Sequence, residues 1–369
     1  MDITNLERDY VLSVLNTPHL SLGPLLDKFE LEFAKYIGSR YAIAVNSGTS
    51  GLHLSVKALN IGEGDAVITT PFSFVASSNC ILFERARPIF VDIDPKNYNI
   101  DSEKIEDAIK KVRRQELKIK AILPVHVFGN PCNMGQINNL GKRHEIEVIE
   151  DACEAFGAEW NGKKLGTFGK VGVFAFYPNK QITTGEGGMV VTNNRRIAEL
   201  CKSLRNQGRS ENGGWLAHAR LGYNYRLSDI NCALGLAQLR RVNEILRKRK
   251  EVAALYNEKL KNIEEIHIPY EEDALYNRSW FVYVIELGRR YSRHARDNIL
   301  EGLRSAGISC NNYFTPIHLQ PFYRKMFGYK RGDFPITEHV SERTIALPFF
   351  NNLTEEQINC VVKNLKKLL

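Results

Sequence analysis

The chain has 369 residues, of which 43% are hydrophobic, and this size and composition favour a large core in a main domain with a smaller second one. No apolar stretch approaches the ~20 residues that cross a membrane, and residues 1–15 carry acidic side chains where a signal peptide carries basic ones, so we expect a cytoplasmic protein without a membrane partner. The formal net charge of +8 favours an anionic partner, which could be a nucleic acid, an acidic surface or a phosphorylated small molecule.

Short apolar runs alternate with helical patterns over the first half of the chain. After an N-terminal arm (1–23), residues 24–38 have helical spacing and end at a glycine. Strand-like runs then alternate with helix-like stretches such as 51–60 and 102–115, at 41–46, 65–70, 87–94, 120–129 and 146–151. This alternation predicts an α/β fold with a mostly parallel sheet sandwiched by helices.

Two further strand-like runs, 171–177 and 188–193, bring the predicted sheet to seven strands. Too few residues join them for a helical crossover. We therefore expect at least one of them to run in the opposite direction or to connect tightly.

A long amphipathic helical pattern begins at Ser228 and Asp229, which can cap its start, and continues to about residue 263. A helix of this length often connects two domains. Strand-like residues 279–287 and helix-like residues 295–308 and 354–369 then predict a smaller α+β unit. We therefore predict a large domain over residues 1–245 and a small C-terminal domain over residues 246–369.

Two features of the composition argue against nucleic acids and metals as partners. The basic cluster at 239–251 has a helical pattern, is interleaved with acidic residues and contains no known nucleic-acid-binding motif. We therefore interpret it as a solvated helix face. The seven cysteines are dispersed and form no C-x-x-C pair, which argues against a disulfide framework and a zinc site. We expect free, mostly buried thiols, no metal and no nucleic-acid partner.

Ligands of open parallel sheets bind beyond the carboxyl ends of the strands, and two segments there carry unusual residues. "NSGTSGLHL" (46–54) puts small and hydroxyl side chains between a strand and a helix start, where they could hold an anion or simply cap the helix. "VIEDACEAFG" (148–157) ends a strand with Glu150 and Asp151. These carboxylates could pair with a protonated heterocycle, bind a metal, or only cap a turn.

A third unusual segment, "FYPNKQITTGEGG" (176–188), places Lys180 before a tight reversal at Gly185, Gly187 and Gly188 that lets the next strand pass close by. An isolated lysine at a strand end is usually a surface charge, but a buried lysine amine can form a Schiff base with a carbonyl group. An anion cradle, a carboxylate and such a lysine are together the three partners that pyridoxal 5′-phosphate needs.

The order of these groups, at 47–50, 151 and 180, on an α/β sheet with a small C-terminal domain resembles the aspartate-aminotransferase-like fold, fold type I of the pyridoxal phosphate enzymes. More narrowly, the chain resembles the DegT/DnrJ/EryC1/StrS family of sugar aminotransferases over nearly its whole length. The motifs that carry the resemblance are "NSGTSGLHL", "TTPFSFVASSN", "PVHVFGNPCNM", "VIEDACEAFGAEWNGKKLGTFG", "FYPNKQITTGEGGMVVT", "LRNQGR", "GYNYRLSDINCALGLAQL" and "TPIHLQPFY".

The resemblance implies roles for the cofactor residues. Lys180 would hold the cofactor as an internal aldimine and later move the proton as a base. Asp151 would keep the pyridine nitrogen protonated. Thr49 and Ser50, beside Gly48, would bind the phosphate group.

The resemblance also implies residues around the ring and the substrate. Phe74 would stack on the ring face, and Asn224 would reach the phosphate of the neighbouring subunit's cofactor, which implies a homodimer with shared sites. His318 would contact the sugar substrate or the amino donor, and Arg226 would help to bind an anionic substrate across the dimer interface.

Two residues depart from the pattern of the family. Ala175 stands where the family usually has a serine that contacts the phosphate, which predicts weaker cofactor retention. Glu154 stands near the cofactor's 3-hydroxyl group, where many relatives carry glutamine or histidine. A carboxylate there would repel a phenolate unless it is protonated or turned aside.

The activity implied is transfer of an amino group from an amino acid, with L-glutamate as the expected donor, to a nucleotide-linked keto-deoxy sugar through a pyridoxamine phosphate intermediate. A keto-cyclitol or another non-nucleotide keto-sugar remains open as the acceptor. The dehydratase branch of the family replaces the lysine with histidine, so Lys180 counts against it. A non-catalytic regulatory or binding member of the fold is the alternative from another class, and the presence of all three groups counts against it.

Overall fold

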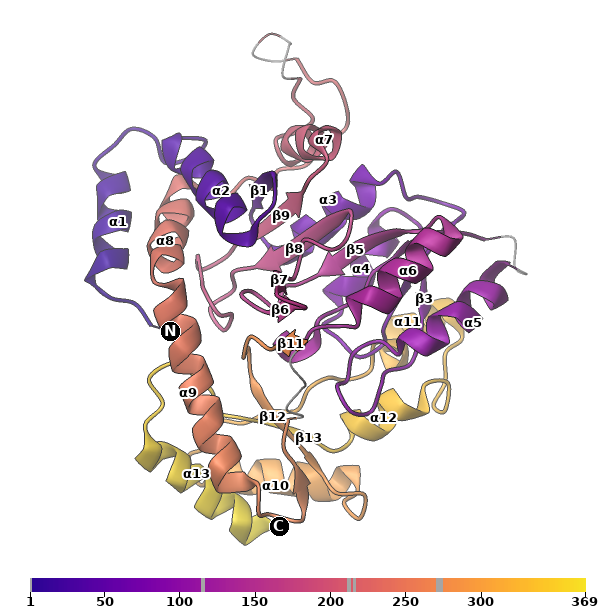
Figure 1. Cartoon of the computed structure of the whole chain (residues 1–369), viewed down its shortest axis with the longest axis vertical. Coiled ribbons are helices and arrows are strands. Elements are labelled where there is room, and N and C mark those ends of the chain that lie inside the picture. Colours follow the sequence, from indigo (N-terminus) through magenta and orange to yellow (C-terminus); the bar gives the residue numbers. More distant parts are fainter. Residues whose placement is uncertain (1, 114–116, 211–213, 215–216, 270–274) are drawn as a thin grey trace.

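The computed structural model describes residues 2–113, 117–210, 214, 217–269 and 275–369. At its centre lies a seven-stranded sheet (Figure 1), in which β9 is antiparallel to both its neighbours and the other adjacent strands are parallel. The predicted mostly parallel α/β sheet with one reversed strand is thus confirmed. Across the sheet the strands are β1 (Tyr41–Val45), β9 (Gly188–Thr192), β8 (Val171–Ala175), β5 (Glu147–Asp151), β4 (Lys118–Ile122), β2 (Asp65–Thr69) and β3 (Arg87–Phe90).

The strand β4 ends earlier than the apolar pattern at 120–129 suggested. Pro124 has no N–H group to continue the ladder, and the chain turns into a short 3₁₀ helix, η1 (Val127–Gly129). Phe128, inside this turn, has a φ of 57°. The turn directs the Phe128 N–H group toward Glu154.

Helices cover both faces of the sheet (Figure 1). Strand β1 shows how the sequence builds both cores, because successive side chains of a strand point to opposite faces: Ala42 and Ala44 join one core, and Ile43 and Val45 join the other. The first core is completed by α2 (Pro24–Ile37), α5 (Ser102–Arg113), α6 (Met134–His144) and α8 (Asp229–Arg240), and the opposite face by α3 (Gly48–Ala58), α4 (Ala76–Phe83) and α7 (Arg195–Arg205).

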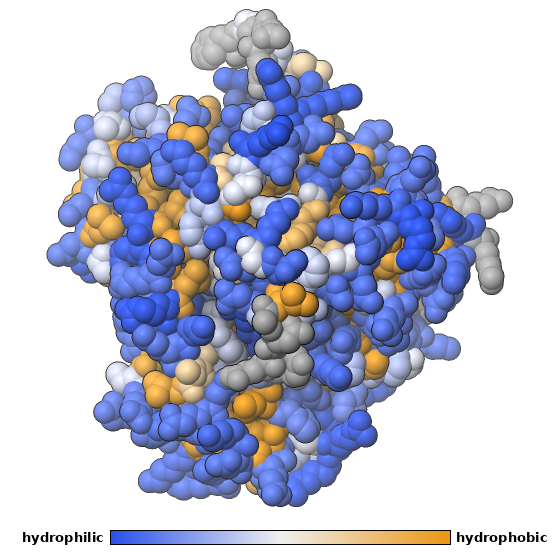
Figure 2. Space-filling model, viewed as in Figure 1, coloured by the Kyte–Doolittle hydropathy of each residue, from blue (hydrophilic) through white to orange (hydrophobic). Residues whose placement is uncertain are grey.

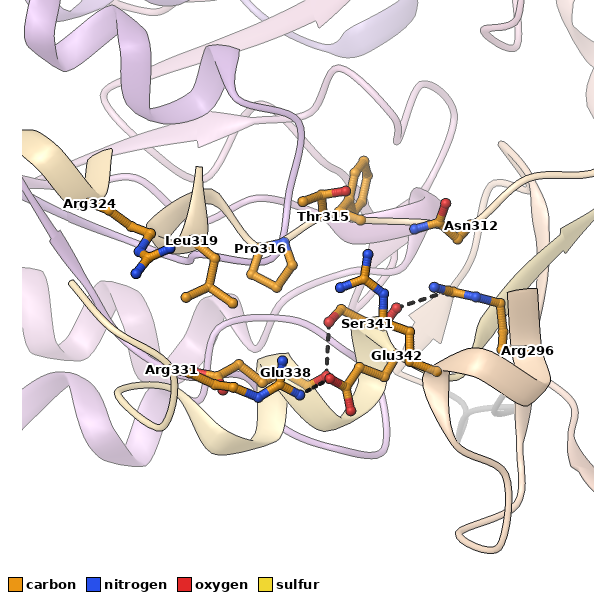
Figure 3. A pocket seen from close by; sticks show the side chains of 12 residues that line it. Arg296, Asn312, Thr315, Pro316, Leu319, Arg324, Arg331, Glu338, Ser341 and Glu342 are labelled. Atoms are coloured by element: carbon orange, nitrogen blue, oxygen red, sulfur yellow. Dashed lines mark hydrogen bonds and ion pairs between the residues drawn. The ribbon is translucent and has the colours of Figure 1, made fainter. Parts of the chain in front are cut away.

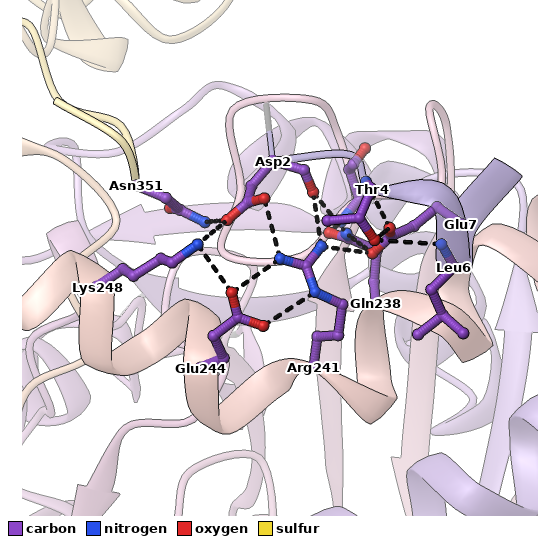
Figure 4. A network of polar contacts seen from close by, with 10 residues as sticks. Asp2, Thr4, Leu6, Glu7, Gln238, Arg241, Glu244, Lys248 and Asn351 are labelled. Carbon is purple, nitrogen blue, oxygen red and sulfur yellow. Dashed lines mark hydrogen bonds and ion pairs between the residues drawn. The ribbon is translucent and has the colours of Figure 1, made fainter.

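The helical pattern at 228–263 forms two helices, α8 and α9 (Val242–Leu260), with a break at Arg241. The Arg241 guanidinium pairs with Asp2, Glu7 and Glu244 at 2.8 to 3.0 Å (Figure 4). The N-terminal arm therefore binds at the break, and it contains a helix that we did not predict, α1 (Asn5–Leu15), which packs along α8.

The C-terminal part of the chain has its own hydrophobic core around a three-stranded antiparallel sheet, β10 (Ile266–His267), β12 (Tyr283–Leu287) and β13 (Thr344–Leu347). The helices α9, α10 (Arg293–Ser305) and α13 (Glu355–Leu368) pack against it. The division into a large domain over residues 1–245 and a small C-terminal domain over residues 246–369 stays a proposal, and α9 crosses its boundary. Three shorter helices connect the C-terminal core to the side of the large sheet: η2 (Ile317–Leu319), α11 (Pro321–Phe327) and α12 (Pro335–Ser341).

A second small sheet joins the two parts of the chain. β11 (Tyr276–Asn277) pairs with β6 (Glu159–Trp160), which pairs with β7 (Lys163–Lys164). Strands of two residues leave no periodic pattern, and we did not predict them.

The face of the molecule in Figure 2 is mostly hydrophilic, with scattered apolar residues. Among the described residues, no helix is both long and apolar enough to span a bilayer. All seven cysteines are free, and Cys360 is the exposed one, which confirms the prediction of mostly buried thiols.

Candidate active site

A cavity of about 550 Å³ lies at the carboxyl ends of β5 and β8. Residues from Ser47, at the start of α3, to Phe314, in the C-terminal part of the chain, line it. Among the residues proposed from the sequence, the cavity brings together Gly48, Thr49, Phe74, Asp151, Glu154 and Lys180.

The first wall is the start of helix α3. The Ser47 hydroxyl caps this helix by accepting from the Ser50 N–H group at 3.0 Å, and the Ser50 hydroxyl donates to Asn46 Oδ1 at 2.6 Å. Ser50 is buried and does not line the cavity, whereas the half-buried Thr49 does. The hydroxyl of Thr49 and the free N–H groups at the helix start can therefore bind an anion.

At two glycines of this wall, neighbouring segments of the chain approach each other closely. A Cβ atom on Gly48 would lie 2.7 Å from the Cβ of Ala175, so the helix start and the end of β8 touch. A Cβ atom on Gly188 would lie 2.6 Å from the carbonyl oxygen of Ser47. The glycine-rich turn after Lys180 thus lets β9 begin close to the start of α3, and the sequence had predicted such a close approach.

The two adjacent carboxylates at the end of β5 point to different surroundings. Glu150 is fully buried and accepts hydrogen bonds from the N–H groups of Gly166, Phe168 and Gly169 at 2.6 to 2.8 Å. Its role is structural, and only Asp151 lines the cavity.

Asp151 is 3% exposed and held in place by two donors. Its Oδ2 accepts from the Ser77 hydroxyl at 2.7 Å, and its Oδ1 accepts from the Cys153 N–H group at 3.1 Å. A buried carboxylate that faces a cavity can hold a protonated ring nitrogen.

Lys180 is not a surface charge, because its side chain is only 14% exposed. Its Nζ lies 4.0 Å from the centre of the Phe281 ring and 3.6 Å from Oε1 of Glu154. Both the amine and Asp151 face the same cavity, so a ligand that carries a cationic ring and a carbonyl group can meet both.

Glu154 is buried beside the lysine, and burial raises the pKa of its carboxyl group despite the attraction of Lys180. Its Oε2 accepts from the Phe128 N–H group at 2.9 Å. Burial therefore makes the neutral acid easier to reach than it is for an exposed glutamate, and a neutral acid can donate a hydrogen bond to an anionic oxygen.

Arg249 is a residue near the site that we did not predict. It lies in the basic cluster that we interpreted as a solvated helix face, and this interpretation was wrong at Arg249, which is 6% exposed. Its guanidinium donates to the carbonyl oxygens of Lys180, Trp280 and Phe281 at 3.1 to 3.2 Å, and desolvation lowers its pKa to about 10. It thereby ties the backbone of Lys180 to that of Phe281, whose ring contacts the amine.

Aromatic side chains form much of the remaining lining. Three of them, Phe281, Tyr313 and Phe314, come from the C-terminal part of the chain. Another, Phe74, comes from the N-terminal part and is 63% exposed. Such large apolar surfaces beside a few polar groups are typical of sites for ring-shaped ligands.

Besides Ser50, three of the proposed residues lie away from the cavity. The exposed Asn224 accepts at its backbone oxygen from Asn46 Nδ2 at 3.3 Å, and Arg226 donates to Asn206 Oδ1 at 3.1 Å. His318 is fully buried, with Nε2 at 3.0 Å from Glu338 Oε1. None of the three lines the cavity, and their roles stay predictions.

Comparison with known proteins gives one consistent family. A model described as the DegT/DnrJ/EryC1/StrS aminotransferase family matches residues 1–366. An uncharacterized protein of Methanocaldococcus jannaschii, MJ1066, is 42% identical, with 98% of this chain and 95% of the relative covered. GDP-perosamine synthase of Caulobacter vibrioides is 39% identical at the same coverage. EpsN of Bacillus subtilis, named a putative pyridoxal phosphate-dependent aminotransferase, is 33% identical over 98% of this chain and 92% of its own.

Solved structures agree with these relatives. A DegT DnrJ EryC1 StrS aminotransferase from Brucella abortus superposes with a TM-score of 0.91 at 30% identity, covering 98% of this chain and 95% of the other. Helicobacter pylori PseC, described as an aminotransferase in pseudoaminic acid biosynthesis, superposes with a TM-score of 0.91 at 29% identity, covering 100% and 97%.

Proposed function

Since this chain belongs to the DegT/DnrJ/EryC1/StrS aminotransferase family, we propose that it transfers an amino group from L-glutamate to the keto group of a nucleotide-linked deoxy sugar, with pyridoxal 5′-phosphate as cofactor. The observation that carries the proposal is the largely buried Lys180 side chain, which shares one cavity with Asp151 and the start of α3. The products are 2-oxoglutarate and the amino sugar.

The residues of the cavity fit the cofactor's three groups. Thr49 and the N–H groups at the start of α3 would bind the phosphate, Asp151 would hold the proton on the ring nitrogen, and Lys180 would meet the aldehyde. When bound, the cofactor supplies an electron sink for the carbanion that forms at Cα of the amino donor.

The chain's own groups would then move the protons. Lys180 Nζ would take a proton from Cα of the amino donor. In the second half of the reaction it would deliver a proton to the sugar carbon that receives the amino group. Glu154, whose carboxyl pKa is raised by burial, would lie near the cofactor's 3-oxygen, where its protonated form would donate a hydrogen bond. Phe281, whose ring lies 4.0 Å from the amine, and Tyr313, which lines the cavity, would help to keep water from the amine.

A nucleotide-linked acceptor is supported by two observations. Relatives that are 34% to 39% identical are named GDP-perosamine synthase, and the chain's net charge of +8 suits a substrate with a diphosphate. The direct test incubates the protein with glutamate and a panel of nucleotide-linked keto-sugars, and detects amino sugar and 2-oxoglutarate by mass spectrometry. Products from free keto-sugars or keto-cyclitols alone would contradict the nucleotide-linked acceptor.

We further propose a homodimer in which Asn224 reaches the partner's cofactor phosphate. The exposure of its side chain and its position next to Asn46, at the edge of the anion cradle, support this arrangement. Mixing inactive Lys180→Ala and Asn224→Ala chains tests it, because a hybrid dimer with shared sites regains one intact site. Absence of recovered activity after verified subunit exchange would contradict it.

A further inference from the structure

A second cavity, of about 460 Å³, lies in the C-terminal part of the chain and has arginine as its main polar lining (Figure 3). We call it the arginine cavity. Its arginines come from α10, α11 and the turn before α12: Arg293, Arg296, Arg324 and Arg331. Phe314 lines both this cavity and the active-site cavity, so the two are neighbours.

The acidic residues in the lining are already engaged. Glu338 accepts from His318 Nε2 at 3.0 Å and from the Gly332 N–H group at 2.9 Å. Glu342 forms an ion pair with Arg331. With four guanidinium groups and two carboxylates, the lining keeps two excess positive charges.

The four arginines differ in how much of their bonding capacity is used. Arg296 is 3% exposed, donates to the carbonyl oxygen of Ser341 and pairs with Asp297 at 2.7 Å, so its place is structural. Arg324 has no side-chain hydrogen bond or ion pair within the described part of the chain, and Arg293 has only an exposed contact of 3.8 Å with Asp297. Exposed pairs at that distance are weak, which leaves two guanidinium groups free to bind.

From this arrangement we infer that the arginine cavity binds the diphosphate group of a nucleotide through Arg324 and Arg293. Planar guanidinium groups bind phosphate oxygens in pairs, and an anion with more than one charge matches the excess of the lining. Phe314, Pro316 and Leu319 provide apolar surface beside these charges, against which the nucleotide can pack. The nucleotide is either the end of the substrate, which rests on the proposed function, or a free nucleoside diphosphate.

Calorimetric titration with inorganic pyrophosphate, GDP and UDP tests the site on the full chain. We expect Arg324→Gln and Arg293→Gln each to weaken binding about tenfold, Arg324→Lys to weaken it less, and the double variant to lose it. Higher salt should weaken binding to the wild-type chain.

Both arginines lie in exposed positions, so the variants should keep the wild-type melting temperature. Arg195→Gln, on α7 at the far end of the molecule (Figure 1), is the matched control and should bind as wild type does. Unchanged pyrophosphate binding in the double variant would overturn the inference, as would a wild-type chain that binds none of the three.

Kinetics then separate the two sources of the nucleotide. A raised KM for the sugar nucleotide, with kcat little changed, assigns the cavity to the substrate's own diphosphate. An unchanged KM with lost GDP binding assigns it to a free nucleoside diphosphate. The proposed function has a separate readout, since a wild-type chain that does not convert glutamate to 2-oxoglutarate overturns that function and leaves the titration result standing.

Discussion

The amine of Lys180 lies 3.6 Å from Oε1 of Glu154, a buried carboxyl group whose pKa is raised by desolvation. The sequence had presented Glu154 as a departure that could repel an anionic ring oxygen. Oε2 is held by the Phe128 N–H group, and the upward shift of the pKa reduces the repulsion that an ionised carboxylate would exert on such an oxygen.

Glu154→Gln should remove a pH dependence from stability. The folded pKa lies above the ordinary value of 4.5, so the stabilising contribution of Glu154 is complete below the unfolded pKa and is lost as the pH rises through the folded pKa. Glutamine does not ionise. The melting temperature of the variant, measured without cofactor, should therefore gain on that of the wild type as the pH rises from 4.5 to neutral. A difference that does not change with pH would contradict the assignment.

Ala175→Ser should tighten cofactor binding. Ala175 ends β8, lines the cavity and touches Gly48 at the start of α3, so a serine hydroxyl there reaches the anion cradle. One added hydrogen bond is worth about 0.5 to 1.5 kcal/mol, or roughly a two- to tenfold lower Kd for pyridoxal phosphate in a fluorescence titration. Nanomolar affinity in the wild type would contradict the expectation of a missing contact.

Gly188→Ala should displace the cradle. The added Cβ would meet the Ser47 carbonyl oxygen at 2.6 Å, and such overpacking costs about 1 to 3 kcal/mol. We expect a lower melting temperature and weaker cofactor binding. Gly62→Ala is the matched control, because its Cβ would find its nearest neighbour, the Glu84 carbonyl oxygen, at 3.8 Å. Equal effects of the two substitutions would contradict the close approach.

Arg249→Met should destabilise the chain and weaken catalysis together. It leaves buried carbonyl oxygens of Lys180, Trp280 and Phe281 without their donor, at a cost of about 3 kcal/mol in the free energy of unfolding. Denaturant unfolding measures the first effect, and kcat at saturating cofactor measures the second. Arg247→Met, whose exposed side chain lies on the same helix, should change neither. A variant with wild-type kcat would mean that Arg249 does not position Lys180.

The order of strands, helices and motif residues was predictable because each depends on local sequence. Hydrophobic periodicity locates the strands, and the small and glycine residues at their ends mark the cradle and the turn after Lys180. The resemblance to the family singled out Asp151, but no local pattern distinguishes it from Glu150, because the difference depends on which face of β5 the turn at residues 166–169 covers.

Contacts between distant segments of the chain could not be predicted from the sequence, for a related reason. The pairing of Lys180 with Phe281 joins segments far apart in the chain, and Arg249 lies in a basic run whose other members look the same. Which arginine of that run is buried depends on how α9 packs against the C-terminal core, and no local pattern records it.

The central claim is that the Lys180 amine is the group that receives the cofactor's aldehyde. Its most direct test incubates the protein with pyridoxal phosphate, reduces it with borohydride and maps the modified peptide by mass spectrometry. We predict a pyridoxyl group on Lys180 and none at any site of a folded Lys180→Ala variant. Modification of exposed lysines such as Lys35, with Lys180 unmodified, would contradict the account.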